Sequence, residues 1–101
     1  MSDFSVNELD TVIHGKIRLG VMAYLASAGS ANFTVLKDKT GSTDGNLSTH
    51  LQKLERANYV TIDKSFHNKK PLTIINLTET GRTAWIEYLT RMQELLMPKS
   101  H

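Results

Sequence analysis

The sequence predicts a mainly α-helical fold (α+β) with one small β-hairpin, in the order four helices, two strands and one helix. Three observations predict it. Apolar residues recur every three to four positions over most of the chain, which is the spacing of helices with one buried face. Between residues 59 and 77 this spacing gives way to runs of aromatic and β-branched residues that alternate with polar ones. The chain has 101 residues, enough for one domain, residues 1–101, with one core.

The composition excludes several classes of protein. Cysteine is absent, which excludes disulfides and thiolate metal sites. No apolar run approaches the roughly 20 residues that cross a bilayer, and residues 1–4 lack the character of a signal peptide, so we expect a cytoplasmic protein without a membrane partner. The formal net charge is only +2, but residues 37–70 carry seven basic and four acidic side chains. The positive charge, which favours polyanionic partners, is therefore concentrated in the middle third.

Two helices are predicted in the first 28 residues. Residues 3–13 hold apolar side chains at roughly helical spacing, which predicts a short helix that ends near His14. The second helix is predicted from Lys16 to Ala28, because apolar residues recur there every three to four positions. Gly29 follows where a left-handed C-cap belongs.

The next two helices are predicted to form a helix-turn-helix over about residues 33–57. A small-residue turn at residues 30–32 precedes the first of them, which covers residues 33–39 and stops at Gly41. The second helix has Ser42 or Thr43 as its N-cap and runs to about residue 57. Its leucines share one face, at positions Leu47, Leu51 and Leu54. Two helices with a tight connection and a polar outer face on the second are what a helix-turn-helix requires.

A β-hairpin and a last helix complete the chain. Strands are predicted at residues 59–63 and 72–77, and the polar, basic segment 64–71 between them suits an exposed loop. A lone hairpin must pack on helices to be stable. Thr78 is a good N-cap for the last helix, predicted over about residues 79–97.

The outer face of the fourth helix is polar and short, which suits entry into a nucleic-acid groove. Amides such as those of Asn46 and Gln52 can pair with adenine edges, and Asp44 could accept from cytosine or stabilise the helix N-terminus. An ordinary solvated surface would look the same. The candidate DNA contacts on this helix are Thr43, Asp44, Gly45, Asn46, Ser48, Thr49, Gln52, Lys53 and Arg56.

The hairpin loop adds basic candidates, namely Lys64, His67, Lys69 and Lys70. These side chains could reach phosphates or a minor groove beside the inserted helix. A solvated turn is the alternative, since lysine also protects exposed strand edges. A helix-turn-helix followed directly by a basic hairpin is more specific than either, because the two can bracket one stretch of duplex.

Five sequence pieces, in their order and spacing over about residues 9–90, resemble those of small winged-helix transcription regulators of the MarR-like and ArsR-like superfamily. They are residues 13–19, 33–36, 45–54, 59–60 and 77–82. The resemblance implies that residues 43–56 are a major-groove recognition helix and that residues 64–71 are the tip of a wing covering about residues 59–77. Relatives with a wing-tip arginine insert it into the minor groove; lysines stand here, which favours phosphate contact. The metal-sensing relatives use cysteine ligands, which this chain lacks.

The last helix carries an apolar stripe broader than one packing contact needs, which predicts a homodimer interface. Its first two turns could simply cover the core. The candidate interface residues are Phe4, Val6, Leu9, Trp85, Tyr88, Leu89, Met92, Leu95 and Leu96. A two-fold dimer would hold its recognition helices about 34 Å apart, which matches half-sites one duplex turn apart.

Neither catalysis nor a bound cofactor is expected. The four histidines form no close-spaced ligand pair, so no metal is predicted, and neither a nucleophile elbow nor a phosphate-binding glycine loop occurs. The sequence therefore predicts a regulator that binds double-stranded DNA as a homodimer. An unidentified small-molecule effector at the dimer interface is compatible with this. The alternative is a winged-helix module that binds another protein instead of DNA.

Overall fold

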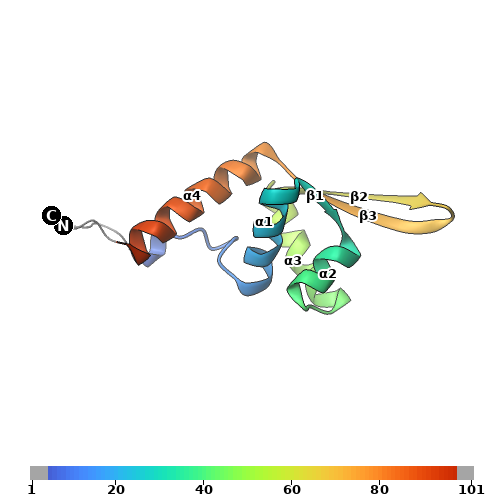
Figure 1. Ribbon diagram of the computed structural model, residues 1–101, viewed down its shortest axis with the longest axis horizontal. Helices are drawn as coiled ribbons and strands as arrows, with labels where there is room; N and C mark the ends of the chain where they lie inside the picture. Colours follow the sequence, from blue (N-terminus) through green and yellow to red (C-terminus); the bar gives the residue numbers. More distant parts are fainter. Residues whose placement is uncertain (1–4, 98–101) are drawn as a thin grey trace.

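The computed structural model describes residues 5–97. A three-stranded antiparallel sheet of order β1-β3-β2 packs against the helices. The β2–β3 hairpin extends toward one end of the molecule, and the C-terminal end of α4 extends toward the other (Figure 1). In chain order the elements are η1 (Val6–Glu8, a 3-10 turn), α1 (Lys16–Ala28), β1 (Ser30–Asn32), α2 (Phe33–Thr40), α3 (Asp44–Arg56), β2 (Val60–His67), β3 (Lys70–Leu77) and α4 (Glu79–Leu96).

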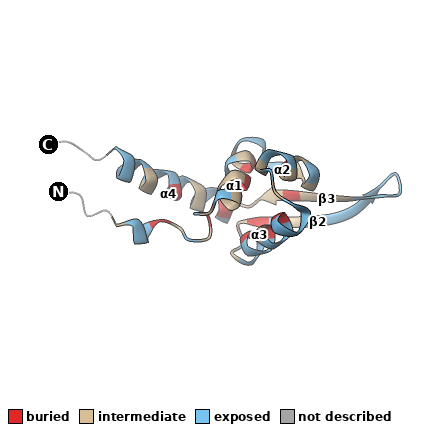
Figure 2. Cartoon of the chain, turned by 90° about the horizontal axis from the view of Figure 1, so that it is seen from below, coloured by how far each residue is buried: buried red, intermediate tan, exposed pale blue. Residues whose placement is uncertain are grey.

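The core forms where α1, α2 and α3 meet the base of the sheet. The leucine face of α3 is buried as predicted, and α1 supplies Val21, Met22 and Leu25 to the same cluster. Burying a side chain of this size contributes about 1.5 to 3 kcal/mol, so these contacts fix α3 against the rest of the chain. The opposite face of α3 and the outer part of the hairpin remain exposed (Figure 2).

Four predicted helices are confirmed, with their caps. Gly29 ends α1 at the predicted position, but its φ of 81° and ψ of −43° lie outside the left-handed helical region that the sequence predicts, in a conformation open to glycine. The Thr43 hydroxyl caps α3 by accepting a hydrogen bond from the Asn46 amide at 3.2 Å. The mainly α-helical fold with a β-hairpin, in roughly the predicted order, is confirmed as well.

The prediction of a helix over residues 3–13 is wrong for residues 5–13. Residues 3 and 4 lie outside the described part of the chain. Only the 3-10 turn η1 forms there. Asp10 Oδ1 then accepts hydrogen bonds from the amides of Val12 (2.8 Å) and Ile13 (3.2 Å), a local turn that competes with a helix. The apolar spacing instead reflects burial of Leu9 and Ile13 in the core.

Two further boundaries differ from the prediction. Residues 30–32 form β1 rather than a turn, because they pair with β3, where Ala31 lies opposite Ile75. The predicted loop 64–71 is mostly strand, and only Asn68 and Lys69 form the turn. Both have positive φ, 52° and 65°, as a two-residue type I′ hairpin turn requires. The hairpin is consequently longer than predicted.

The start of α4 is tied closely to the end of α3. The Thr78 hydroxyl accepts from the Gly81 amide at 2.9 Å and donates to the Asn58 carbonyl at 2.6 Å. A Cβ atom at Gly81 would collide with the Tyr59 carbonyl oxygen, so only glycine permits this close approach. Among the helices of residues 5–97, none combines the length and apolar character that spanning a membrane demands.

Candidate nucleic-acid interface

The outward face of α3 is exposed to solvent along its whole length in the described chain. Every residue predicted there is exposed, and a Cβ built on Gly45 would meet no atom within 4 Å. The backbone can therefore approach a ligand closely at the N-terminal end of the helix. The exposed set comprises Thr43, Asp44, Gly45, Asn46, Ser48, Thr49, Gln52, Lys53 and Arg56.

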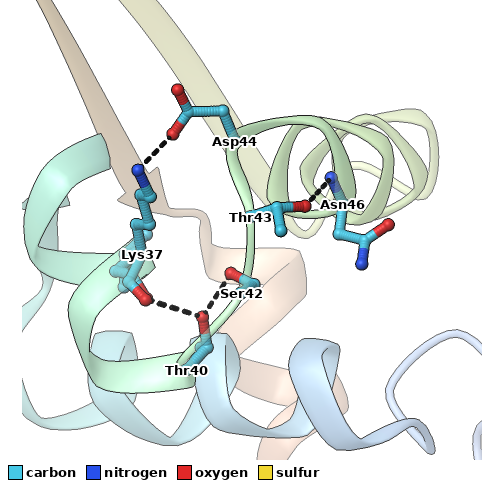
Figure 3. A network of polar contacts seen from close by, with 7 residues as sticks. Lys37, Thr40, Ser42, Thr43, Asp44 and Asn46 are labelled. Carbon is cyan, nitrogen blue, oxygen red and sulfur yellow. Dashed lines mark hydrogen bonds and ion pairs between the residues drawn. The ribbon is translucent and has the colours of Figure 1, made fainter.

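A network of polar contacts fixes the turn that presents α3 (Figure 3). The Thr40 hydroxyl donates to the Leu36 carbonyl at 2.8 Å and lies 2.7 Å from the Ser42 hydroxyl. Gly41 between them has a φ of 64°, in the left-handed region. The connection is therefore a defined turn, which sets the angle between α2 and α3.

An ion pair links the two helices across this turn. Lys37 Nζ lies 2.8 Å from Asp44 Oδ1, and the two side chains are 44% and 75% exposed. The sequence suggested a cytosine contact or a helix-stabilising role for Asp44, and gave no sign of a partner on α2. Lys37 offsets a negative charge at the place where a phosphate backbone would approach.

One flank of the α3 face adjoins the hairpin. The space between them is a hollow of about 460 Å³, lined by Ser48 and Gln52 of α3 and by Lys64 of β2, and also by the acidic side chains of Asp44 and Glu55. Side chains alternate along a strand, so Lys64 points to the same side as the buried Val60. The structure thus brings Lys64 together with two of the predicted base-reading residues.

The other predicted hairpin residues are not gathered with Lys64. His67 and Lys70 lie opposite each other in the strand register, which puts them on the face of the hairpin that points away from α3. Lys69 lies in the turn itself. All three are exposed, so Lys69 and Lys70 present positive charge around the tip rather than toward α3.

The second flank of α3 carries a basic hollow, defined here as the space of about 370 Å³ lined by Arg18, Lys53 and Arg56 together with Thr11, Val12 and Ala57. Arg18 is held in place because its Nε donates to the Val12 carbonyl at 2.5 Å and its Nη1 lies 2.8 Å from His50 Nδ1. Burial, Arg18 and Lys53 lower the pKa of His50. Sequence reasoning missed Arg18, because no local pattern connects α1 with α3.

The predicted dimer residues divide into two groups. Leu9 and Tyr88 are buried within the chain itself, where the Tyr88 hydroxyl lies 2.7 Å from His14 Nδ1. Trp85 stacks on Tyr88 with a centroid distance of 5.8 Å, and both Trp85 and Met92 are partly buried. The exposed members are Val6, Leu89, Leu95 and Leu96, and Phe4 lies outside the described residues.

The N-terminal segment meets α4 at a hollow of about 440 Å³, whose lining includes Glu8, Tyr59 and Arg91. Arg91 Nη1 lies 3.0 Å from Glu8 Oε1, and the Tyr59 hydroxyl donates to Asp10 Oδ2 at 2.5 Å. Burial, this hydrogen bond and the charges of Asp10 and Glu87 raise the pKa of Tyr59 to about 12. In residues 5–97, no three acidic or histidine side chains gather as metal ligands would.

The chain is similar to one curated protein and to several solved structures. It is 34% identical over 84 residues to the uncharacterized protein MJ0432 of Methanocaldococcus jannaschii. The aligned region covers 83% of this chain and 91% of that protein. A transcriptional regulator homologue from Pyrococcus horikoshii OT3 superposes with a TM-score of 0.79 at 26% identity, over 84% of both chains. A MarR-family transcriptional regulator from Silicibacter pomeroyi shares the fold, with a TM-score of 0.59 at 14% identity, over 88% of this chain and 62% of that one.

These comparisons confirm the resemblance to winged-helix regulators. The winged helix DNA-binding domain family matches residues 17–96, from the first turn of α1 to the end of α4. The match includes the helix-turn-helix, the hairpin and the three cations of the basic hollow, Arg18, Lys53 and Arg56. The chain therefore belongs to the winged helix DNA-binding domain family.

Proposed function

We propose that this protein is a transcriptional regulator that reads the sequence of double-stranded DNA, with α3 in the major groove and the β2–β3 hairpin on the neighbouring backbone. One observation carries the proposal. The exposed polar face of α3 is bordered on one flank by the three cations of the basic hollow and on the hairpin flank by Lys64, where Asp44 and Glu55 also line the space.

This arrangement matches the chemistry of a duplex. A major groove is about 12 Å wide, admits one helix and is bordered by phosphates on both sides. The cations of the basic hollow can neutralise one border and Lys64 can contact the other, while the central side chains of α3 reach the base edges. Asn46, Ser48, Thr49 and Gln52 would read bases, and each good bidentate contact discriminates by about 1 to 3 kcal/mol.

The proposed active form is a homodimer that pairs through α4. Leu89, Leu95 and Leu96 remain exposed, and they continue the stripe that begins at the partly buried Trp85. Covering this stripe with a second copy would remove apolar surface from water. A two-fold dimer presents two recognition helices to half-sites about 34 Å apart.

Selection of bound duplexes from a random oligonucleotide pool tests the proposal. A palindromic site is expected, and Gln52→Ala should relax preference at one position of each half-site. Lys69→Ala and Lys70→Ala should weaken all duplexes alike and lower the slope of log K against log salt by about one unit each. Absence of even nonspecific binding at low salt, for which about 10⁻⁴ to 10⁻⁶ M is typical, would favour the protein-binding alternative.

A further inference from the structure

The tip of the hairpin presents an aromatic ring to solvent. Phe66 is 77% exposed, which makes it the most exposed large hydrophobic side chain in residues 5–97. Its partner in the strand register is Pro71, which is also exposed. Residues opposite each other in the register share one face of the hairpin, so Pro71 is the cross-strand neighbour of the ring, and most of the ring remains uncovered.

The ring lies on the face of the hairpin that looks toward α3. Side chains alternate along β2, so Val60, Ile62, Lys64 and Phe66 share one face. Near the core, Ile62 and Lys64 line the hollow beside α3. Phe66 continues the same row outward, beyond the end of the hollow. A duplex seated on α3 would therefore have this face of the hairpin beside it.

The surroundings of the ring favour a polyanion over an apolar protein surface. Lys64, Lys69 and Lys70 lie within four residues of Phe66, whereas the acidic side chain in that range, Asp63, lies on the other face of the hairpin and accepts a hydrogen bond from Asn76. An apolar partner would have to desolvate these charges. A nucleic-acid backbone would neutralise them while the ring entered the groove between its two strands.

We propose that Phe66, backed by Pro71, is an apolar wedge that enters the minor groove next to the site of α3 and partly unstacks a base step. The inference rests on the proposed function. Apolar side chains act in this way in proteins that kink DNA toward the major groove. The wedge adds indirect readout, because pyrimidine–purine steps such as TA unstack most easily.

Duplex binding by Phe66→Ala over a range of salt concentrations tests the wedge. Affinity should fall about tenfold or more at every salt concentration with an unchanged salt slope, because the ring neutralises no phosphate. Lys69→Ala should change the slope instead. A duplex with 2-aminopurine at the contacted step should brighten when the wild-type protein binds, and should stay dark with Phe66→Ala.

A matched control moves the ring to the other face of the hairpin. The double variant Ser65→Phe with Phe66→Ser keeps the composition, and it should bind as weakly as Phe66→Ala. Phe66→Leu should retain most of the affinity, which separates loss of the wedge from loss of the hairpin's fold. Wild-type affinity in Phe66→Ala or in the double variant would overturn the wedge and leave the proposed function standing. Failure of the wild-type protein to bind any duplex at low salt would instead overturn the proposed function.

Discussion

Lys37 and Asp44 form an ion pair of 2.8 Å across the turn between α2 and α3, at the end of α3 where a duplex would be read (Figure 3). Both side chains are substantially exposed, so the pair adds little to stability, about 0 to 1 kcal/mol. Its consequence is electrostatic, because Lys37 screens the carboxylate from an approaching phosphate.

Neutralising Asp44 should strengthen DNA binding. Asp44→Asn removes the negative charge, so nonspecific affinity at low salt should rise several-fold, and Lys37→Ala should lower it. Filter binding or fluorescence anisotropy would measure both. Asp38→Asn, on the exposed side of α2, makes the same change in net charge and should have a smaller effect. If Asp44→Asn weakened binding to one sequence only, Asp44 would be a base contact.

The basic hollow should contribute phosphate contacts. Arg56→Gln and Lys53→Gln should each weaken all duplexes alike and reduce the salt slope by about one unit. Arg82→Gln is the control, because Arg82 lies on α4 and its Nη1 reaches the Ala26 carbonyl. Equal slopes for the wild-type protein and the two hollow variants would place the hollow outside the interface.

Two glycine substitutions should have different effects on stability. Gly81→Ala places a methyl group against the Tyr59 carbonyl, and should lower the free energy of unfolding by about 1 to 3 kcal/mol. Gly45→Ala meets open space on α3, and should leave stability unchanged or raise it slightly. Urea denaturation followed by circular dichroism would compare them. A stable Gly81→Ala protein would mean that α4 shifts freely relative to α3.

The Tyr59–Asp10 hydrogen bond should make stability depend on alkaline pH. The pKa of Tyr59 is raised to about 12 from an ordinary 10.0, so its contribution is fully present below pH 10 and is lost as pH rises toward 12. Tyr59→Phe should lower stability at neutral pH by about 1 to 2 kcal/mol. Its stability should also fall less between pH 10 and 12. Burial and Asp10 raise the pKa of Tyr88 too, so some dependence should persist in the variant.

The helices were predictable because local signals and burial agree in them. In α3 the leucine spacing, the Thr43 cap and the polar outer face all indicate the same helix. Residues 3–13 show the opposite case, since Leu9 and Ile13 have helix-like spacing yet are buried from an irregular segment. The strand β1 carries no strand signal of its own, because Ser30–Asn32 become a strand only by pairing with β3.

The candidate site was predictable where it lies on one element. The exposed residues of α3 follow from its periodicity, but the partners that flank them come from distant segments. Arg18 meets Lys53 and Arg56 only when α1 packs beside α3, and Lys37 meets Asp44 only through the turn geometry. Phe66 has a related cause, since its outward exposure follows from a hairpin longer than the strand signals indicated.

The close contact between Gly81 and Tyr59 fixes the N-terminal end of α4 beside the segment that follows α3. The far end of α4 therefore moves most when the helix tilts. A helix of 18 residues is about 27 Å long, so a tilt of about 5° at this joint displaces its far end by roughly 2 Å. In the proposed two-fold dimer, a molecule that tilts α4 near Leu96 would therefore alter the distance between the two copies of α3. Because Gly81 has no side chain, α4 packs directly on the Tyr59 carbonyl, and this contact couples the tilt of α4 to the position of α3.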